Sequence, residues 1–156
     1  NLTFPFGSYI CVVDIDPKTY EIKIRRFIAI DDCGNIINPM VVEGQIHGGL
    51  TQGLAPAMYE ELSYDEDGNI LNGSLMDYLV PTAVETPNWE TDQTVTPSPH
   101  HPLGAKGVAE SPTVGAPPAI ANAVIDALSH LGVESMGIPI TPFKVWQVLK
   151  DKELAA

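Results

Sequence analysis

One glutamate, Glu110, lies inside a run of small residues and prolines that reads LGAKGVAESPTVGAPPA, residues 103–119. Glycine in such a run lets the backbone approach a ligand or another segment closely. A lone carboxylate there has two interpretations. It is either a loop charge paired with Lys106, four residues earlier, or a general base at a reaction site. These residues alone leave both interpretations open.

A second glycine-rich stretch has the pattern of a helix over about residues 39–60. Asn38 suits the N-cap position and Pro39 suits the first helical position. Each interior glycine costs about 1 kcal/mol relative to alanine in a helix. Close packing against another helix, or the wall of a cofactor site, would offset that cost. The glycines form two pairs, each spaced by one helical turn: Gly44 with Gly48, and Gly49 with Gly53.

The elements that must position these stretches predict an α+β fold. Residues 8–16 and 20–32 predict an antiparallel hairpin, and in the second strand Ile22, Ile24 and Ile28 are expected on one face. The remaining segments are a second hairpin over 58–81, an irregular segment over 81–118, a helix beginning near Pro117 and a final helix capped by Thr141. We expect a two-layer structure in which a mixed or antiparallel sheet packs with helices.

Composition excludes several classes of function. The formal net charge is -12, from 20 acidic against 8 basic residues. Nucleic acid and anionic membrane surfaces are therefore not expected as partners. No apolar run approaches the roughly 20 residues that span a bilayer. Cys11 and Cys33 are expected to be free thiols, and the location is predicted to be cytoplasmic.

Known catalytic signatures do not appear in the sequence. It has no nucleophile elbow, no phosphate-binding loop of the Walker type and no dinucleotide fingerprint. The adjacent residues His100 and His101 are expected to face solvent, because no further histidine or cysteine lies at the spacing of metal ligands. No metal ligand is therefore predicted among the side chains.

Two motifs resemble the large subunit of the molybdenum hydroxylases. GAKGVAESPTVGAPPAIANAVIDAL is similar to the signature near the end of that subunit, and GNIINPMVVEGQIHGGLTQGLAPAMYEEL is similar to its glycine-rich cofactor helix. LMDYLVPTA also resembles a stretch of sequence found in the family, and the motifs occur in the family's order. The family includes xanthine dehydrogenase, aldehyde oxidoreductase and the aerobic carbon monoxide dehydrogenases. The chain looks closest to the carbon monoxide dehydrogenase-like branch.

The resemblance implies a molybdenum–pyranopterin cofactor, in the cytosine dinucleotide form that is usual in bacteria. The family's general base is a glutamate in a GVGE motif, which here reads GVAE and assigns that role to Glu110. In the carbon monoxide-oxidising branch the same glutamate has a second possible role, positioning the ligands of the metal. Ala109 replaces the family glycine, and its Cβ is expected to crowd the cofactor or to forbid a positive φ. The implied cofactor contacts are Gln45, Gly48, Gly49, Ala105, Lys106, Gly107, Val108 and Ala109.

The resemblance also implies what surrounds the chain. Residues 1–156 correspond to the C-terminal part of a molybdopterin-binding domain, as a fragment or as a split subunit. The implied partners are the remainder of the large subunit, an iron–sulfur small subunit, an FAD-bearing medium subunit and a small-molecule substrate. Carbon monoxide, an aldehyde and an N-heterocycle stay open as substrates. The alternative is a non-catalytic assembly or scaffold piece. Lys106 is expected either to contact the cofactor or to be a surface charge.

Overall fold

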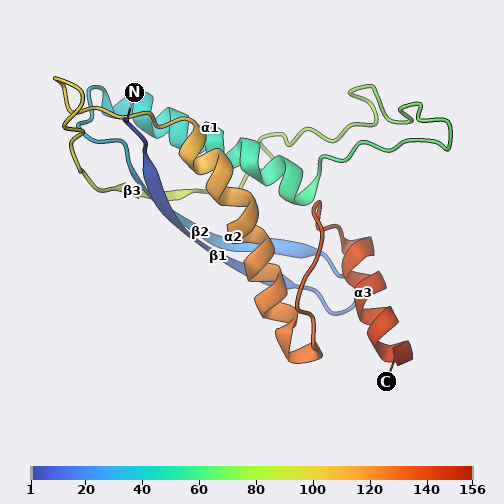
Figure 1. The fold of residues 1–156 in the computed structure, drawn as a ribbon. Helices are drawn as coiled ribbons and strands as arrows, with labels where there is room; N and C mark the ends of the chain where they lie inside the picture. The colour runs from blue at the N-terminus through green and yellow to red at the C-terminus, as the bar shows by residue number, and fades with distance from the viewer. Residues whose placement is uncertain (1, 156) are drawn as a thin grey trace.

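The computed structural model describes residues 2–155, which form a mixed three-stranded sheet with helices packed against it (Figure 1). The sheet order is β1-β2-β3, with β1 antiparallel to β2 and β2 parallel to β3. This arrangement confirms the expected α+β class. The elements are β1 (Phe6–Ile15), β2 (Ile22–Asp32), α1 (Pro39–Met58), β3 (Glu90–Gln93), α2 (Glu110–Leu128), the short 3₁₀ helix η1 (Ser129–Leu131) and α3 (Pro142–Ala155).

A β-bulge interrupts the hairpin of β1 and β2. Val12 pairs with Arg26 but Val13 pairs with Ile24, so Arg25 is the extra residue. An extra residue moves every later side chain to the opposite face of a strand. The expectation that Ile28 shares the inner face with Ile22 and Ile24 is therefore wrong. Beyond the bulge the buried inner face instead carries Phe27, Ala29 and Asp31.

Two apolar clusters form the core, one on each half of the sheet. In the first, Phe27 and Ala29 of β2 pack with buried residues of both long helices: Ile46, Leu50, Leu54 and Ala57 of α1, and Ala116 and Ile120 of α2. In the second, the C-terminal half of α2 packs with α3 and with the turn end of the hairpin, through Val124, Leu128, Val133, Ile140 and Val145. None of the described helices is long and apolar enough to cross a membrane.

The contact between α1 and α2 explains one of the two glycine pairs. A Cβ added at Gly49 would lie 2.5 Å from Pro112 Cγ, and one added at Gly53 would lie 2.8 Å from Ala116 Cβ. These glycines therefore let the two helices approach closely. The other pair, Gly44 and Gly48, has no atom within 4 Å of an added Cβ. Packing within the described residues gives no reason for that pair.

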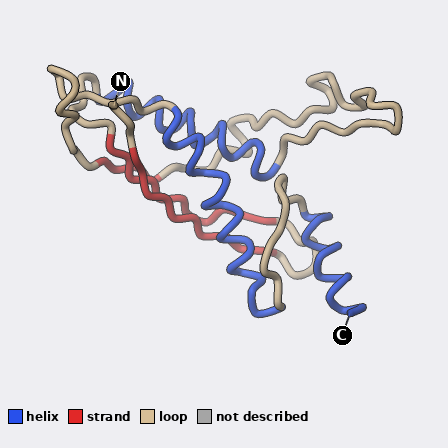
Figure 2. Tube along the Cα trace, viewed as in Figure 1, coloured by secondary structure: helices blue, strands red, loops and turns tan. Residues whose placement is uncertain are grey.

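The segment between α1 and β3 differs from its expected structure. The predicted hairpin over residues 58–81 is wrong, because only one antiparallel bridge, between Tyr64 and Ile70, forms around the turn. Asp65 holds that turn by accepting hydrogen bonds from the backbone of Asp67 and Asn69. The segment between α1 and β3 extends away from the sheet (Figure 2). Its end returns as β3, a strand that the proline-rich sequence over 81–118 did not predict.

Gly53→Ala is expected to lower the stability of the intact protein, although alanine normally stabilises a helix. Its Cβ would overpack the contact with Ala116, and overpacking costs about 1–3 kcal/mol. The matched control is Gly44→Ala in the same helix, where the added methyl has free space and should stabilise by up to about 1 kcal/mol. Denaturant unfolding of both variants measures the difference. Equal stabilisation by both substitutions would contradict the packing described here.

Candidate functional site

Glu110 is the first residue of helix α2, and not a residue of an irregular loop. The helix begins at Glu110, so the expected start near Pro117 is wrong, and Pro112, Pro117 and Pro118 all lie within α2. The N-cap residue Ala109 offers no side-chain hydrogen bond to the first turn. A carboxylate in the first turn of a helix is stabilised by the helix dipole and by nearby unpaired N–H groups.

The side chain of Glu110 lines an open groove of about 620 Å³ between the N-terminal segment and α2. Glu110 is the only acidic residue among the described residues that line it. A groove with one carboxylate beside a helix N-terminus provides a proton acceptor next to donors for an anionic group. The groove is lined by Phe4, Pro5, Gly7, Tyr9, Glu110, Ser111, Val114, Gly115, Pro118, Ala119 and Asn122.

Ala109 has an ordinary helical backbone, with φ at -60° and ψ at -36°. The expectation that an alanine here would forbid a required positive φ is therefore wrong, because this position needs no positive φ. Ala109 is exposed, so its methyl group adds no clash within the described chain. The positive φ in this region belongs to Gly104, at +67°, where a Cβ would lie 2.6 Å from Asn35 Nδ2.

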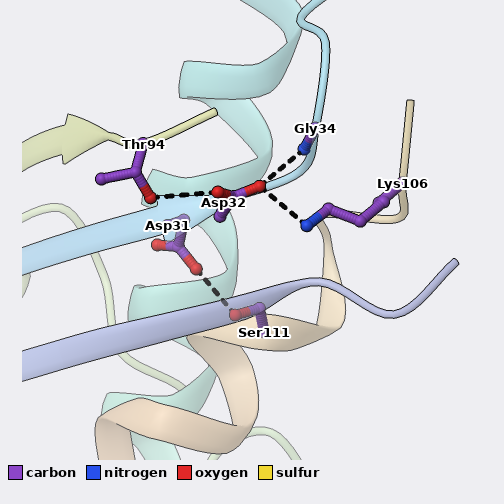
Figure 3. Close-up of polar contacts among 6 residues, drawn as sticks. All are labelled: Asp31, Asp32, Gly34, Thr94, Lys106 and Ser111. Atoms are coloured by element: carbon purple, nitrogen blue, oxygen red, sulfur yellow. Dashed lines mark hydrogen bonds and ion pairs between the residues drawn. The ribbon is translucent and has the colours of Figure 1, made fainter. Parts of the chain in front are cut away.

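Lys106 is paired with Asp32 and not with Glu110. Its ammonium Nζ lies 2.8 Å from Asp32 Oδ1, and the two side chains are 8% and 0% exposed. The interpretation of Glu110 as the partner of Lys106 is therefore wrong. Lys106 is also not a plain surface charge, because its side chain is almost fully buried and its ammonium lies 4.8 Å from the centre of the Phe6 ring. Figure 3 shows the pair at the end of β2.

Asp32 accepts further hydrogen bonds, from the Gly34 backbone at 2.9 Å and from the Thr94 hydroxyl at 3.1 Å. Burial by itself would raise the pKa of this carboxyl. The hydrogen bonds from Lys106, from Gly34 and from Thr96 outweigh burial and lower the pKa of Asp32 well below its usual range. Asp32 is therefore a charged, fully engaged structural group.

Asp31, the preceding residue, binds the first turn of α2. Its Oδ1 accepts a hydrogen bond from Ser111 Oγ at 2.7 Å and another from the Tyr9 hydroxyl. Burial and the hydrogen bond to Asp31 raise the pKa of Tyr9, so its hydroxyl stays protonated as a donor. Gly7 and Gly115 flank the Tyr9 ring, and a Cβ at either position would collide with it. The network therefore occupies a space that two glycines leave open.

The loop before α2 is fixed by backbone contacts. Ala105 forms an antiparallel bridge with Gly34, and the Lys106 N–H donates to the Cys33 carbonyl at 2.7 Å. Gly107 is open, because an added Cβ would meet only Pro5 Cδ at 3.9 Å. Val108 is half-buried against the first core cluster. Gly107 is exposed, and its N–H donates to the Thr3 carbonyl at 3.4 Å.

The residues expected on α1 divide between two environments. Gln45 and Gly48 are exposed, whereas Gly49 is buried against α2. Contacts advance in the same direction along both helices, since Gly49 meets Pro112 and Gly53 meets Ala116. Gln45 lies one turn before Gly49, so it lies toward the N-terminal end of α2. The structure thus brings α1 to the start of α2 through Gly49, whereas neither Gln45 nor Gly48 lines the groove that carries Glu110.

Comparison with known proteins identifies the family. Residues 1–87 match the molybdopterin cofactor-binding domain family. The chain belongs to this family. It is also 61% identical, over 155 residues, to the carbon monoxide dehydrogenase large chain of Hydrogenophaga pseudoflava, covering 99% of this chain and 19% of that one. The resemblance to molybdenum hydroxylases is therefore confirmed.

Solved structures agree with the sequence match. Carbon monoxide dehydrogenase from Oligotropha carboxidovorans superimposes with a TM-score of 0.92 and 55% identity, over 97% of this chain and 19% of that chain. Quinoline 2-oxidoreductase from Pseudomonas putida 86 gives 0.89 and 42%, over 93% of this chain and 18% of that chain. This molybdopterin cofactor-binding chain thus spans about a fifth of the length of these relatives.

Four residues of the site were not predicted from the sequence: Tyr9, Asp31, Asp32 and Ser111. A signal for two of them exists, because the strand FIAIDD ends in two adjacent acidic residues directly before a turn. Adjacent strand residues point to opposite faces, so one of the two must enter the core and needs hydrogen-bond donors there. Within the described residues, no group of three or more His, Cys, Asp or Glu side chains forms a metal site.

Asp32→Asn is expected to destabilise the intact protein and to flatten its acid response. Removal of one partner of a buried pair costs about 3–5 kcal/mol. The folded pKa of Asp32 lies below the unfolded value of about 3.9, so the stability from this group is complete above about pH 5. It is lost as the pH falls below about 4 toward the folded pKa. Denaturant unfolding from about pH 6 to pH 2.5 measures both effects.

The control for this experiment is Asp14→Asn, which removes an exposed ion pair with Arg25. Exposed pairs contribute little to stability, so this variant should resemble the original protein at every pH. Parallel stability curves for Asp32→Asn and the original protein would contradict the role of Asp32.

Proposed function

We propose that this chain forms the C-terminal part of the cofactor-binding region of a molybdenum hydroxylase large chain, with Glu110 as the general base. The observation that carries the proposal is the position of Glu110, at an uncapped helix N-terminus beside an open groove. The 61% identity to a carbon monoxide dehydrogenase large chain supports it. Oxidation of a small substrate, with water as the oxygen source, is the proposed reaction.

The residues present fit a molybdenum–pyranopterin group. Gly48 leaves the backbone of α1 uncovered where an added Cβ would touch nothing, and at Gly107 an added Cβ would meet only Pro5 Cδ at 3.9 Å. Gln45 adds an exposed side-chain amide on α1. Clearance beside an exposed side-chain amide suits a flat, hydrogen-bonding cofactor. We propose the cytosine dinucleotide form of the cofactor.

The proposed contacts have different roles. Gln45 and Gly48 on α1, together with Ala105, Gly107, Val108 and Ala109, would line the cofactor. Gly49 and Lys106 would support these residues without contacting the cofactor, because Gly49 packs on α2 and Lys106 is bound to Asp32. The cofactor supplies oxygen transfer and accepts the electrons when it is bound. The Glu110 carboxylate would accept the proton that oxygen transfer releases, and the first-turn N–H groups of α2 would favour nearby negative charge.

The substrate and the remaining subunits follow from similarity. Identity is 61% to the carbon monoxide dehydrogenase large chain and 42% to the nicotine 6-hydroxylase large subunit of Paenarthrobacter nicotinovorans. This difference favours carbon monoxide over an aldehyde or an N-heterocycle. In that branch positioning the ligands of the metal is the alternative role for Glu110, in place of base catalysis. The remainder of the large chain, an iron–sulfur subunit and an FAD subunit are the proposed partners.

A non-catalytic scaffold is the second candidate, and its main support was the alanine at position 109. The backbone of Ala109 is unstrained, so this substitution gives no conformational reason to expect lost chemistry. The scaffold function is therefore the less favoured of the two.

Glu110→Gln in the assembled enzyme is expected to lower turnover per molybdenum by about 10²–10⁴-fold, because the amide cannot accept a proton. Molybdenum and pterin contents should stay unchanged, since Glu110 is exposed and glutamine has nearly the same size. Turnover with carbon monoxide, an aldehyde and quinoline, measured beside metal analysis, tests the role and the substrate together.

The control is Glu134→Gln, which changes an exposed carboxylate beyond the far end of α2 and should leave turnover unchanged. Full activity of Glu110→Gln with normal molybdenum content would refute the base role. An assembled enzyme without molybdenum or pterin would support the scaffold function instead.

A further inference from the structure

The segment that carries Glu110 is bound to the sheet at both of its ends. Lys106 lies four residues before Glu110 and is bound to Asp32, while Ser111 directly follows Glu110 and is bound to Asp31. Figure 3 shows Lys106 beside Asp32 and Ser111 beside Asp31, both on the segment that carries Glu110. The residues between these attachments, 107–110, include only Glu110 as a titratable side chain.

The two attachments differ in kind. Asp32 forms a buried ion pair that is supported by Gly34 and Thr94, so it fixes the start of the segment strongly. Asp31 holds its end through hydroxyl groups, and no described cation pairs with it. Because the bulge in β2 turns Asp31 toward α2, the two adjacent aspartates hold the segment from different sides of the strand.

Burial of Asp31 lowers the stability of the fold. It is 1% exposed, and its second oxygen, Oδ2, is buried without a hydrogen-bond partner among the described residues. A buried polar atom without a partner costs about 1–3 kcal/mol. Two glycines also keep space for Tyr9, which donates to the same carboxylate. Stability alone does not explain this arrangement, and such exceptions are common at functional sites.

We propose that Asp31 and Ser111 are positioning residues for the proton transfer by Glu110, with Asp32 and Lys106 as the second attachment. This inference rests on the proposed function of Glu110. Ser111 shares the first turn of α2 with Glu110, so its hydrogen bond to Asp31 fixes the rotation and height of that turn. A displacement of about 1 Å at a reacting group lowers a rate by about 10²-fold.

The test is Ser111→Ala in the assembled enzyme, measured as turnover per molybdenum. We expect kcat to fall by about 10–100-fold with KM and the pterin content unchanged, because a positioning residue acts on the proton transfer alone. Ser111→Thr keeps the hydroxyl and should restore most of the rate. The matched control is Ser129→Ala, which removes a hydroxyl that donates to Asp126 near the opposite end of the same helix.

A double-variant experiment separates this proposal from the base role. In the Glu110→Gln background, Ser111→Ala should lower kcat no further, because both residues act on the same step. Equal losses in both backgrounds would overturn the positioning role while leaving the base role intact. Full turnover per molybdenum in Ser111→Ala, even with reduced cofactor loading, would also overturn it. Full activity of Glu110→Gln would instead overturn the proposed function itself.

Discussion

Two adjacent carboxylates buried at one end of β2 are the constraint on which the candidate site depends. Each is essentially inaccessible, at 1% exposure for Asp31 and 0% for Asp32, so each needs donors from elsewhere in the chain. The donors come from segments distant in sequence: Lys106 and Ser111 from the glycine-rich segment, and Tyr9 from β1. Satisfying the aspartates therefore fixes that segment against the sheet. Glu110 follows as a residue whose backbone has little freedom.

The helices complete the same arrangement from the other side. Gly49 and Gly53 let α1 lie directly on the start of α2, where a Cβ added at Gly49 would lie 2.9 Å from the Ala109 carbonyl oxygen. The core beneath them is continuous, with Phe27 of β2 in contact with both helices. The two long helices thus share a single packed interface. The bulge at Arg25 sets which side chains of β2 reach that interface.

The sequence predicted the parts of this structure that depend on local patterns. The hairpin, the Asn38 N-cap of α1 and the role of Thr141 before α3 follow from alternation and capping preferences. The start of α2 at Glu110 was missed, because Pro117 and Pro118 suggested a helix boundary and tertiary packing on Gly49 outweighs that preference. The inner face of β2 beyond Arg25 was predicted wrongly, because a bulge leaves no local signature in the sequence. The pairing of Lys106 with Asp32 spans 74 residues, beyond the reach of spacing arguments.

The most direct test of the account is a crystal structure of the assembled enzyme with its cofactor bound. The account predicts that the Glu110 carboxylate lies within about 2.6–3.2 Å of a ligand of the molybdenum, or one water molecule away. It also predicts that Lys106 stays on Asp32 and Ser111 on Asp31 in that structure. A Glu110 side chain directed away from the metal, with Lys106 released from Asp32 to contact the pterin, would contradict it.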